Sequence, residues 1–170
     1  ISLAALFLFT ETKAAIIKIG RNESFHSLKE GISIARNGDT LLLQEGTYRE
    51  GNIILSKSIS IIGENFPVLD GENKYEIITV HANDVVIKGL KFINTGIASM
   101  SDVAAIKALE CRNLRIVDNR FENTFFGIYF ANSSESLIEN NQMQSDVDTE
   151  HQIANGIHMW KCDRITIQNN

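Results

Sequence analysis

The chain has 170 residues, of which 44% are hydrophobic and 22% are charged, and its formal net charge is −5. These values are ordinary for a globular protein with one sizeable core, and a single proline argues against a disordered linker. The acidic balance, without a basic stripe, excludes nucleic acid as an expected partner.

The chain opens with an apolar run over residues 1–9, and the small residues of Lys13-Ala14-Ala15 follow it. This pattern is typical of the back half of a secretory signal peptide and is too short to span a bilayer as a helix. We therefore predict that residues 1–14 are a residual signal peptide and that the protein is exported; a buried strand or helix is the alternative. We expect one domain over residues 24–170, cut within a repeat.

Residues 24–37 have the pattern of a short amphipathic helix. Leu28, Ile32 and Ala35 fall on one face, and Ser27 is a suitable N-cap. We expect this helix to cover the first open end of the fold. Short strands are then predicted at Thr40–Gln44, Ile53–Leu55 and Ile59–Ile62.

From residue 77 onward, isoleucines return ten residues apart in successive segments. The pairs are Ile77 and Ile87, Ile106 and Ile116, Ile128 and Ile138, and Ile157 and Ile167. Self-similarity at this spacing indicates stacked units that cannot bury their apolar faces alone. Because each unit holds short alternating strands, we predict an all-β fold, a single-stranded right-handed parallel β-helix with a short N-terminal capping helix.

Alternation within the strands predicts which side chains face inward. The inward set is Ile106, Ala108, Ile128, Phe130, Ile157 and Met159. The outward set is Lys107, Tyr129 and His158, with Leu109, Ala131 and Trp160 beside them. A further inward position is shared by asparagines, which we interpret as a structural amide ladder formed by Asn119, Asn141 and Asn170.

The two cysteines are predicted to be free thiols. Cys111 and Cys162 take the same place in their repeats, with Ser133 in the coil between them. Coils about 4.8 Å apart would separate the two by about 10 Å, whereas a disulfide needs Cα atoms within about 7 Å.

Two coils carry seven extra residues at the same corner, in the segments Thr95–Val103 and Asp146–Ala154. Insertions at one corner of a solenoid usually form its binding face. We therefore expect two loops that flank a shallow groove floored by Phe125–Ile128. Tyr129, Trp160 and Leu109 would be exposed nearby, and we interpret them as a contact surface for a protein partner, with sugar stacking as the alternative.

Several segments in order resemble the NosD family of nitrous oxide reductase maturation proteins, over roughly residues 27–170. The segments are SIARNGDT (33–40), EGTY (45–48), IGE (62–64), LDG (69–71), VIKGLKF (86–92), FGIY (126–129) and NGIHMW (155–160). The resemblance implies a periplasmic copper-binding accessory protein that is not an enzyme. It also implies, as partners, nitrous oxide reductase, the permease and ATPase of an ABC transporter, and other copper chaperones.

Copper(I) prefers sulfur and imidazole ligands. The candidates that the pattern leaves outside the core are Met100, His151 and His158, which could share one transient site; solvated or contact residues are the other interpretation. The acidic run Asp146, Asp148, Glu150 could hold Ca²⁺, although it lacks the glycine and terminal glutamate of a Ca²⁺ loop.

The second functional hypothesis is a carbohydrate-active or carbohydrate-binding β-helix, similar to a polysaccharide lyase or a uronate epimerase. Such an enzyme needs an acid and a base in a groove. The charged candidates do not converge on one pocket in the expected register; they are Arg115, Asp118, Arg120, Glu139 and Arg164.

Overall fold

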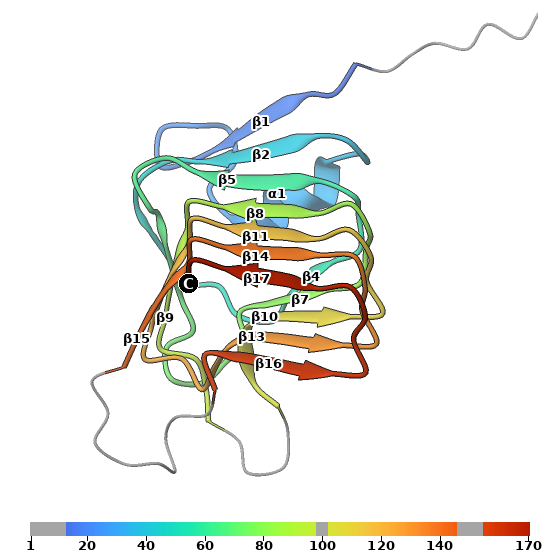
Figure 1. The fold of residues 1–170 in the computed structure, drawn as a ribbon. Helices are drawn as coiled ribbons and strands as arrows, with labels where there is room; N and C mark the ends of the chain where they lie inside the picture. Colours follow the sequence, from blue (N-terminus) through green and yellow to red (C-terminus); the bar gives the residue numbers. More distant parts are fainter. Residues whose placement is uncertain (1–12, 98–101, 146–154) are drawn as a thin grey trace, which may run out of the picture.

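The strands form three parallel sheets, which we call sheets A, B and C, and each coil from β2 onward to β16 contributes one strand to each (Figure 1). The computed structural model describes residues 13–97, 102–145 and 155–170. Across these residues the chain passes from sheet A to sheet B to sheet C and then begins the next coil. The predicted right-handed parallel β-helix is therefore confirmed.

Sheet A is the longest of the three sheets in the described ranges. It contains β1 (Ile16–Ile19), β2 (Thr40–Leu43), β5 (Ser60–Gly63), β8 (Val86–Lys88), β11 (Arg115–Val117), β14 (Leu137–Glu139) and β17 (Thr166–Gln168). Sheet B contains β3 (Thr47–Tyr48), β6 (Val68–Asp70), β9 (Lys91–Ile93), β12 (Arg120–Glu122) and β15 (Gln142–Gln144). Sheet C contains β4 (Ile53–Leu55), β7 (Ile78–Val80), β10 (Ala104–Leu109), β13 (Phe126–Ala131) and β16 (Ile157–Trp160).

The core consists of apolar columns, one or two from each sheet. In sheet C, Ile106, Ile128 and Ile157 are direct partners in neighbouring strands, as predicted. In sheet B, Phe92 and Phe121 stack with their ring centroids 5.1 Å apart. Each fully buried side chain of this size contributes about 1.5–3 kcal/mol to folding, so these columns hold the coils in register.

The predicted register was wrong at one place. Ile78, and not Ile77, is the partner of Ile106, and Ile78 also pairs with Ile53. Ile77 and Ile78 are both fully buried. Because two adjacent apolar residues are buried here, the period-two pattern does not distinguish the two registers in the sequence.

Helix α1 (Leu28–Ile34) covers the first coils and is shorter than the predicted span of 24–37. Ser27 is its N-cap and forms a capping box with Glu30. The Lys57 ammonium closes the other end by donating to three main-chain carbonyls, including that of Ala35. Strand β1 precedes the helix, so the stack begins before residue 24; residues 1–12 lie outside the described residues.

The asparagine ladder is confirmed. Asn119 Nδ2 donates to Asn141 Oδ1 at 3.1 Å, and Asn141 Nδ2 donates to Asn170 Oδ1 at 2.8 Å. Each of the three amide oxygens also accepts a main-chain N–H one coil back; Asn119 Oδ1, for example, accepts that of Leu90. The column therefore satisfies the buried backbone at the corner between sheets A and B.

Both cysteines are free, as predicted. Cys111 is buried, and its main-chain N–H donates to Ser133 Oγ in the next coil. Burial raises the pKa of the Cys111 thiol. Within the described ranges, no helix combines the length and apolar character needed to cross a membrane.

Candidate functional site

The outer face of sheet C carries a column of side chains with one member from each coil. Strand pairing aligns Ile54, Thr79, Lys107, Tyr129 and His158 in this order along the stack. We call these five residues the outer column. The strands that carry them lie parallel in the lower part of Figure 1. The column therefore follows the axis of the β-helix.

An aromatic cluster occupies one end of the outer column. The rings of Tyr129 and His158 are stacked, with centroids 5.2 Å apart and an angle of 12° between their planes. Phe126 meets both rings, at 5.6 Å from Tyr129 and 5.1 Å from His158. Phe125 continues the cluster at 5.1 Å from Phe126. The Tyr129 and His158 rings are thus held in fixed orientations on a face that stays partly open to solvent.

A buried ion pair supports the middle of the column. Lys107 Nζ lies 2.5 Å from a Glu76 carboxylate oxygen, and the two side chains are only 17% and 16% exposed. The Thr79 hydroxyl donates to the other Glu76 oxygen. Lys107 Nζ also lies 5.8 Å from the centre of the Tyr129 ring. The ammonium group is therefore neutralised by Glu76 beneath the aromatic cluster.

The surroundings of Tyr129 disfavour ionisation of its phenol. Burial raises its pKa, and the hydrogen bond to Asp102, the charge of Asp102 and the charge of Cys162 raise it further. The Asp102 carboxylate is therefore close enough to the phenol to disfavour its ionisation. His158 Nδ1 lies 3.4 Å from the Asn155 side-chain nitrogen. A protonated phenol beside an imidazole provides both a proton donor and a proton acceptor.

The residues predicted to form a contact surface for a protein partner lie in two separate columns. Leu109, Ala131 and Trp160 are partners in one column, whereas Tyr129 is in the outer column two residues earlier. Trp160 is 58% exposed and Leu109 is half-buried. Strand alternation places both columns on the outside, but the small buried Ala131 separates Leu109 from Trp160.

The predicted groove floor is mostly interior. Of Phe125–Ile128, Phe125 is half-buried and the other three residues are buried. The Phe125 main-chain N–H donates to Thr95 Oγ1 at 2.7 Å, which joins the start of the first insertion to this coil. The remaining parts of the two predicted loops, residues 98–101 and 146–154, lie outside the described residues.

Of the predicted copper ligands, His158 is in the outer column, stacked on Tyr129. Met100 and His151 lie outside the described residues, as do Asp146, Asp148 and Glu150. In the described ranges, no group of three or more His, Cys, Asp and Glu side chains is arranged to hold a metal ion. Copper binding and the reductase, transporter and chaperone partners stay predictions.

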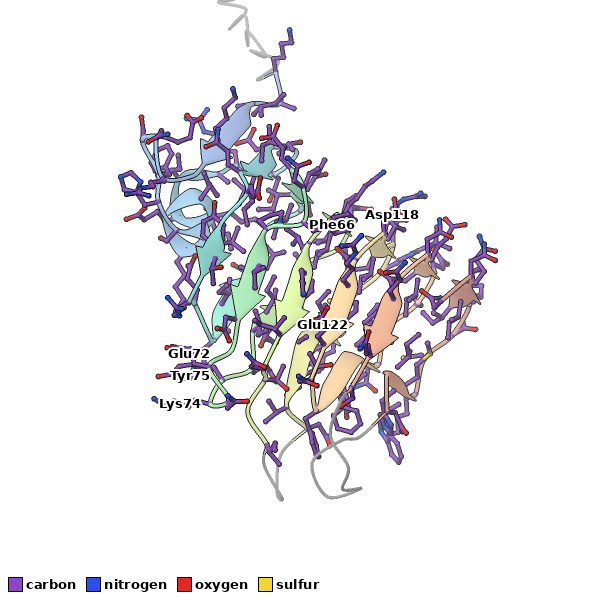
Figure 2. The ribbon with its side chains drawn as sticks, turned by 90° about the vertical axis from the view of Figure 1, so that its left-hand side faces the viewer. Phe66, Glu72, Lys74, Tyr75, Asp118 and Glu122 are labelled. Carbon is purple, nitrogen blue, oxygen red and sulfur yellow. The ribbon has the colours of Figure 1, made fainter. Side chains whose placement is uncertain are left out.

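The charged candidates named for a lyase lie apart from the outer column. Asp118 pairs with Lys88, and the Arg120 guanidinium lies 3.8 Å from the centre of the Phe66 ring. Phe66 and Asp118 are near each other at the corner of sheets A and B, with Glu122 further along sheet B (Figure 2). These groups belong to another face of the stack.

Sequence reasoning missed Glu76, Thr79 and Asp102 as members of the site. Because the predicted register used Ile77 in place of Ile78, it did not identify Thr79 as an outward residue. Asp102 lies near the end of the first insertion, two residues before β10, and this position was a usable signal.

No family model matches the chain, and a search of curated proteins found no match to it. Among solved structures, the chain is similar to pectin methylesterase PemA from Erwinia chrysanthemi, at 12% identity over 92% of this chain and 67% of that one, with a TM-score of 0.54. It is also similar to the pectin methylesterase from Aspergillus niger in deglycosylated form, at 10% identity over 94% of this chain and 77% of that one, with a TM-score of 0.49.

The likeness to PemA shows a shared fold, and it corrects one expectation. The prediction that this chain is not an enzyme is contradicted, because the solved structure that shares its fold is an enzyme. That prediction was drawn from short motifs that recur in many β-helices, whereas a fold by itself hosts many activities. The role of this chain has to be argued from the outer face of sheet C.

Proposed function

We propose that this chain is a carbohydrate-active β-helix that binds a polysaccharide along the outer column and transfers a proton on a bound sugar. The observation that carries the proposal is the stacked pair of Tyr129 and His158 beside the ion pair of Lys107 and Glu76. The PemA comparison supports this function class because PemA is named as a pectin methylesterase.

The shape of the column favours a linear polymer as the ligand. Its members follow the stack axis with one side chain about every 4.8 Å. Aromatic rings bind the apolar faces of sugars, and polar groups between them bind the hydroxyls. The exposed Trp160, two residues after His158, provides the first kind of contact, and the polar edges of Tyr129 and His158 provide the second. A chain of sugars laid along the axis would touch successive coils.

The chemistry that fits this face is β-elimination. His158 would accept the proton from the carbon next to the sugar's carbonyl group. The electron pair of that C–H bond would form a carbon–carbon double bond, and the glycosidic oxygen would leave with the proton of Tyr129. Solvent would then return a proton to the phenolate and remove one from the imidazole. A tyrosine phenol is protonated at neutral pH, so the proton donor is available.

We also propose that the protein acts outside the cytoplasm, in the periplasm, because the apolar run at residues 1–9 is typical of an export signal. Export would bring the protein to the compartment in which cell-wall and extracellular polysaccharides occur.

The test is incubation of the purified chain with a panel of polysaccharides, with detection of the conjugated double bond by ultraviolet absorbance. We expect one polymer class to give product, and His158→Ala to lose at least about a hundredfold in rate. The matched control is His26→Ala, since His26 lies beside helix α1 and not on sheet C. If no polymer binds or reacts, whereas copper(I) binds tightly and the affinity depends on His158, the carbohydrate proposal is wrong.

A further inference from the structure

We infer that the corner between sheets A and B holds a second binding site, built on Phe66 and Arg120, for a small hydroxylated carboxylate. This corner belongs to another face of the stack than the outer column, so the site is independent of the proposed function. The features that point to it are an inserted aromatic ring in a strained conformation, a guanidinium group without a partner, and free amide groups beside them.

An insertion places Phe66 at this corner. Between paired positions, the chain uses residues 63–67 to pass from β5 to β6, whereas residues 89–90 are enough to pass from β8 to β9 in the next coil. Phe66 has a φ of 56°, and it is the one aromatic residue with a positive φ in the described ranges. A bulky side chain rarely adopts this conformation, and strain of this kind is typical of positions kept for a function.

The Phe66 ring holds a guanidinium group that has no carboxylate partner. Arg120 Cζ lies 3.8 Å from the centre of the ring. The neighbouring Lys88 is paired, with its Nζ 3.2 Å from an Asp118 carboxylate oxygen. In the parts of the chain that the structure describes, the Arg120 side chain forms neither an ion pair nor a hydrogen bond. The ring therefore fixes the position of the cation and leaves its N–H donors for a ligand.

A cavity of about 270 Å³ opens beside this cation, where Phe66 and Asp118 lie near each other (Figure 2). Its lining consists of Phe66, Asp118, Asn119, Arg120, Asn140 and Gln142. Because Lys88 neutralises Asp118, the lining keeps one positive charge. Gln142 is the direct strand partner of Arg120, so two neighbouring strands hold the amide and the cation side by side. Asn140 and Gln142 are exposed, and their side chains form no hydrogen bond to another described residue.

These groups match a carboxylate that carries hydroxyls. A planar guanidinium binds both oxygens of a carboxylate through two parallel N–H donors. One positive charge balances a monoanion, whereas a phosphate dianion would bring excess negative charge to a chain with a net charge of −5. The free amides donate and accept, as hydroxyl groups require. The cavity is smaller than the pockets of about 300–1,000 Å³ that hold drug-sized ligands, so it fits one small acid.

The experiment titrates the full chain with sodium gluconate at constant ionic strength and follows the side-chain N–H signals of Arg120 and Gln142 by NMR. Parallel titrations use glucitol, which has the hydroxyls without the charge, propionate, which has the charge without the hydroxyls, and inorganic phosphate. We expect gluconate to shift both signals and to bind at least about tenfold more tightly than glucitol. No shift with gluconate, propionate binding as tight as that of gluconate, or tighter binding of phosphate would each overturn the inference.

The matched variants are Arg120→Gln and Lys91→Gln, which each remove one positive charge from neighbouring strands of sheet B. Lys91 is already paired with Glu122 at 2.7 Å. We expect Arg120→Gln to weaken gluconate binding at least about tenfold and Lys91→Gln to weaken it less than about twofold. Arg120→Lys, which keeps the charge without the planar group, should fall between them. Equal losses in the two glutamine variants would overturn the inference, because they would reduce the binding to general charge attraction.

The site can be tested separately from the proposed function. His158→Ala removes the proposed proton acceptor on sheet C and leaves the Phe66 corner unchanged, so we expect it to bind gluconate as the unmodified chain does. Loss of gluconate binding in His158→Ala would contradict a site at Phe66 and Arg120. Polysaccharide activity without gluconate binding would overturn this inference alone, and gluconate binding without such activity would leave it standing.

Discussion

Two columns of polar side chains run along this β-helix, and they do different work. The asparagine column at the corner of sheets A and B is buried at Asn119 and Asn141, and its amides donate and accept along the stack. The outer column on sheet C is partly exposed, and its groups pair across strands through rings and charges. A polar side chain repeated in successive coils thus stabilises the stack when it faces inward, and it provides groups for binding or catalysis when it faces outward.

The two columns differ in how far the hydrogen-bonding groups of their side chains are used within the fold. Asn141 uses its amide oxygen for two donors of Asn119 and its amide nitrogen for two acceptors, one of which is the Ile116 carbonyl. Tyr129 and His158 contact each other through ring faces and keep their polar edges near solvent. Removing an inner amide should therefore cost stability, whereas removing an outer group should cost function. The four predictions below test this contrast.

The largest effect is expected for Asn141→Ala. The substitution removes the acceptor of the Asn119 main-chain N–H and a donor to the Ile116 carbonyl, and each stranded buried group costs about 1–3 kcal/mol. We expect the free energy of unfolding to fall by about 3 kcal/mol or more, measured by urea denaturation. The control Asn83→Ala removes one exposed hydrogen bond and should cost less than about 1 kcal/mol. Equal losses for both variants would contradict a special role of the inner column.

The second effect is functional. Tyr129→Phe keeps the ring stack with His158 and removes the hydroxyl that would donate the proton. We expect the rate on the best polysaccharide to fall by about a hundredfold or more, while the free energy of unfolding changes by less than about 1 kcal/mol. Steady-state kinetics and urea denaturation of the same preparation check both statements. A stable variant with full activity would remove Tyr129 from the proposed chemistry.

The third effect is a shift in titration. Burial and Asp102 raise the pKa of Tyr129, so Asp102→Asn should lower this pKa, although burial keeps it above the usual range. The folded protein holds this proton more tightly than the unfolded chain does. The resulting stabilisation is complete below the pKa of an unfolded tyrosine and is lost as pH rises through the folded value. Tyrosinate absorbance against pH, with Tyr129→Phe subtracted, measures the shift. Superimposable curves for the two proteins would show that Asp102 does not act on the phenol.

The smallest effect concerns an exposed ion pair on the turns between sheets C and A. Arg112 and then Arg164 hold the pKa of Glu135 below its usual range. The folded pKa is depressed, so this stabilisation is present above the unfolded pKa and is lost as pH falls through the folded value. We expect Glu135→Gln to flatten slightly the acid side of the stability profile. Glu64→Gln is the exposed control, and an identical change in both variants would assign the effect to net charge alone.

Sequence periodicity predicted the solenoid and most of its interior. Residues such as Ile116 and Ile138 could be placed because a buried parallel strand requires one apolar side chain at the same position in every coil. The free cysteines and the asparagine ladder followed from the same register. The prediction failed at Ile77, where two neighbouring isoleucines are both buried and the pattern is ambiguous.

The candidate site was only partly predictable. Alternation identified Lys107, Tyr129 and His158 as outward residues, and strand pairing confirms that they are neighbours. It could not assign Glu76 to Lys107 or Asp102 to Tyr129, because these carboxylates come from connecting segments that have no repeating pattern. Short motifs shared by many β-helices led to the expectation of a non-catalytic protein, which the likeness to PemA contradicts.

The amino-acid sequence alone determined the coil, its inward columns and the set of outward side chains, because a period of two and a repeat of coil length are local properties of the chain. Tertiary structure decided which outward groups meet. A stack of parallel strands brings residues more than twenty positions apart to within about 5 Å, and only this packing places a phenol against an imidazole and an ammonium group against a carboxylate.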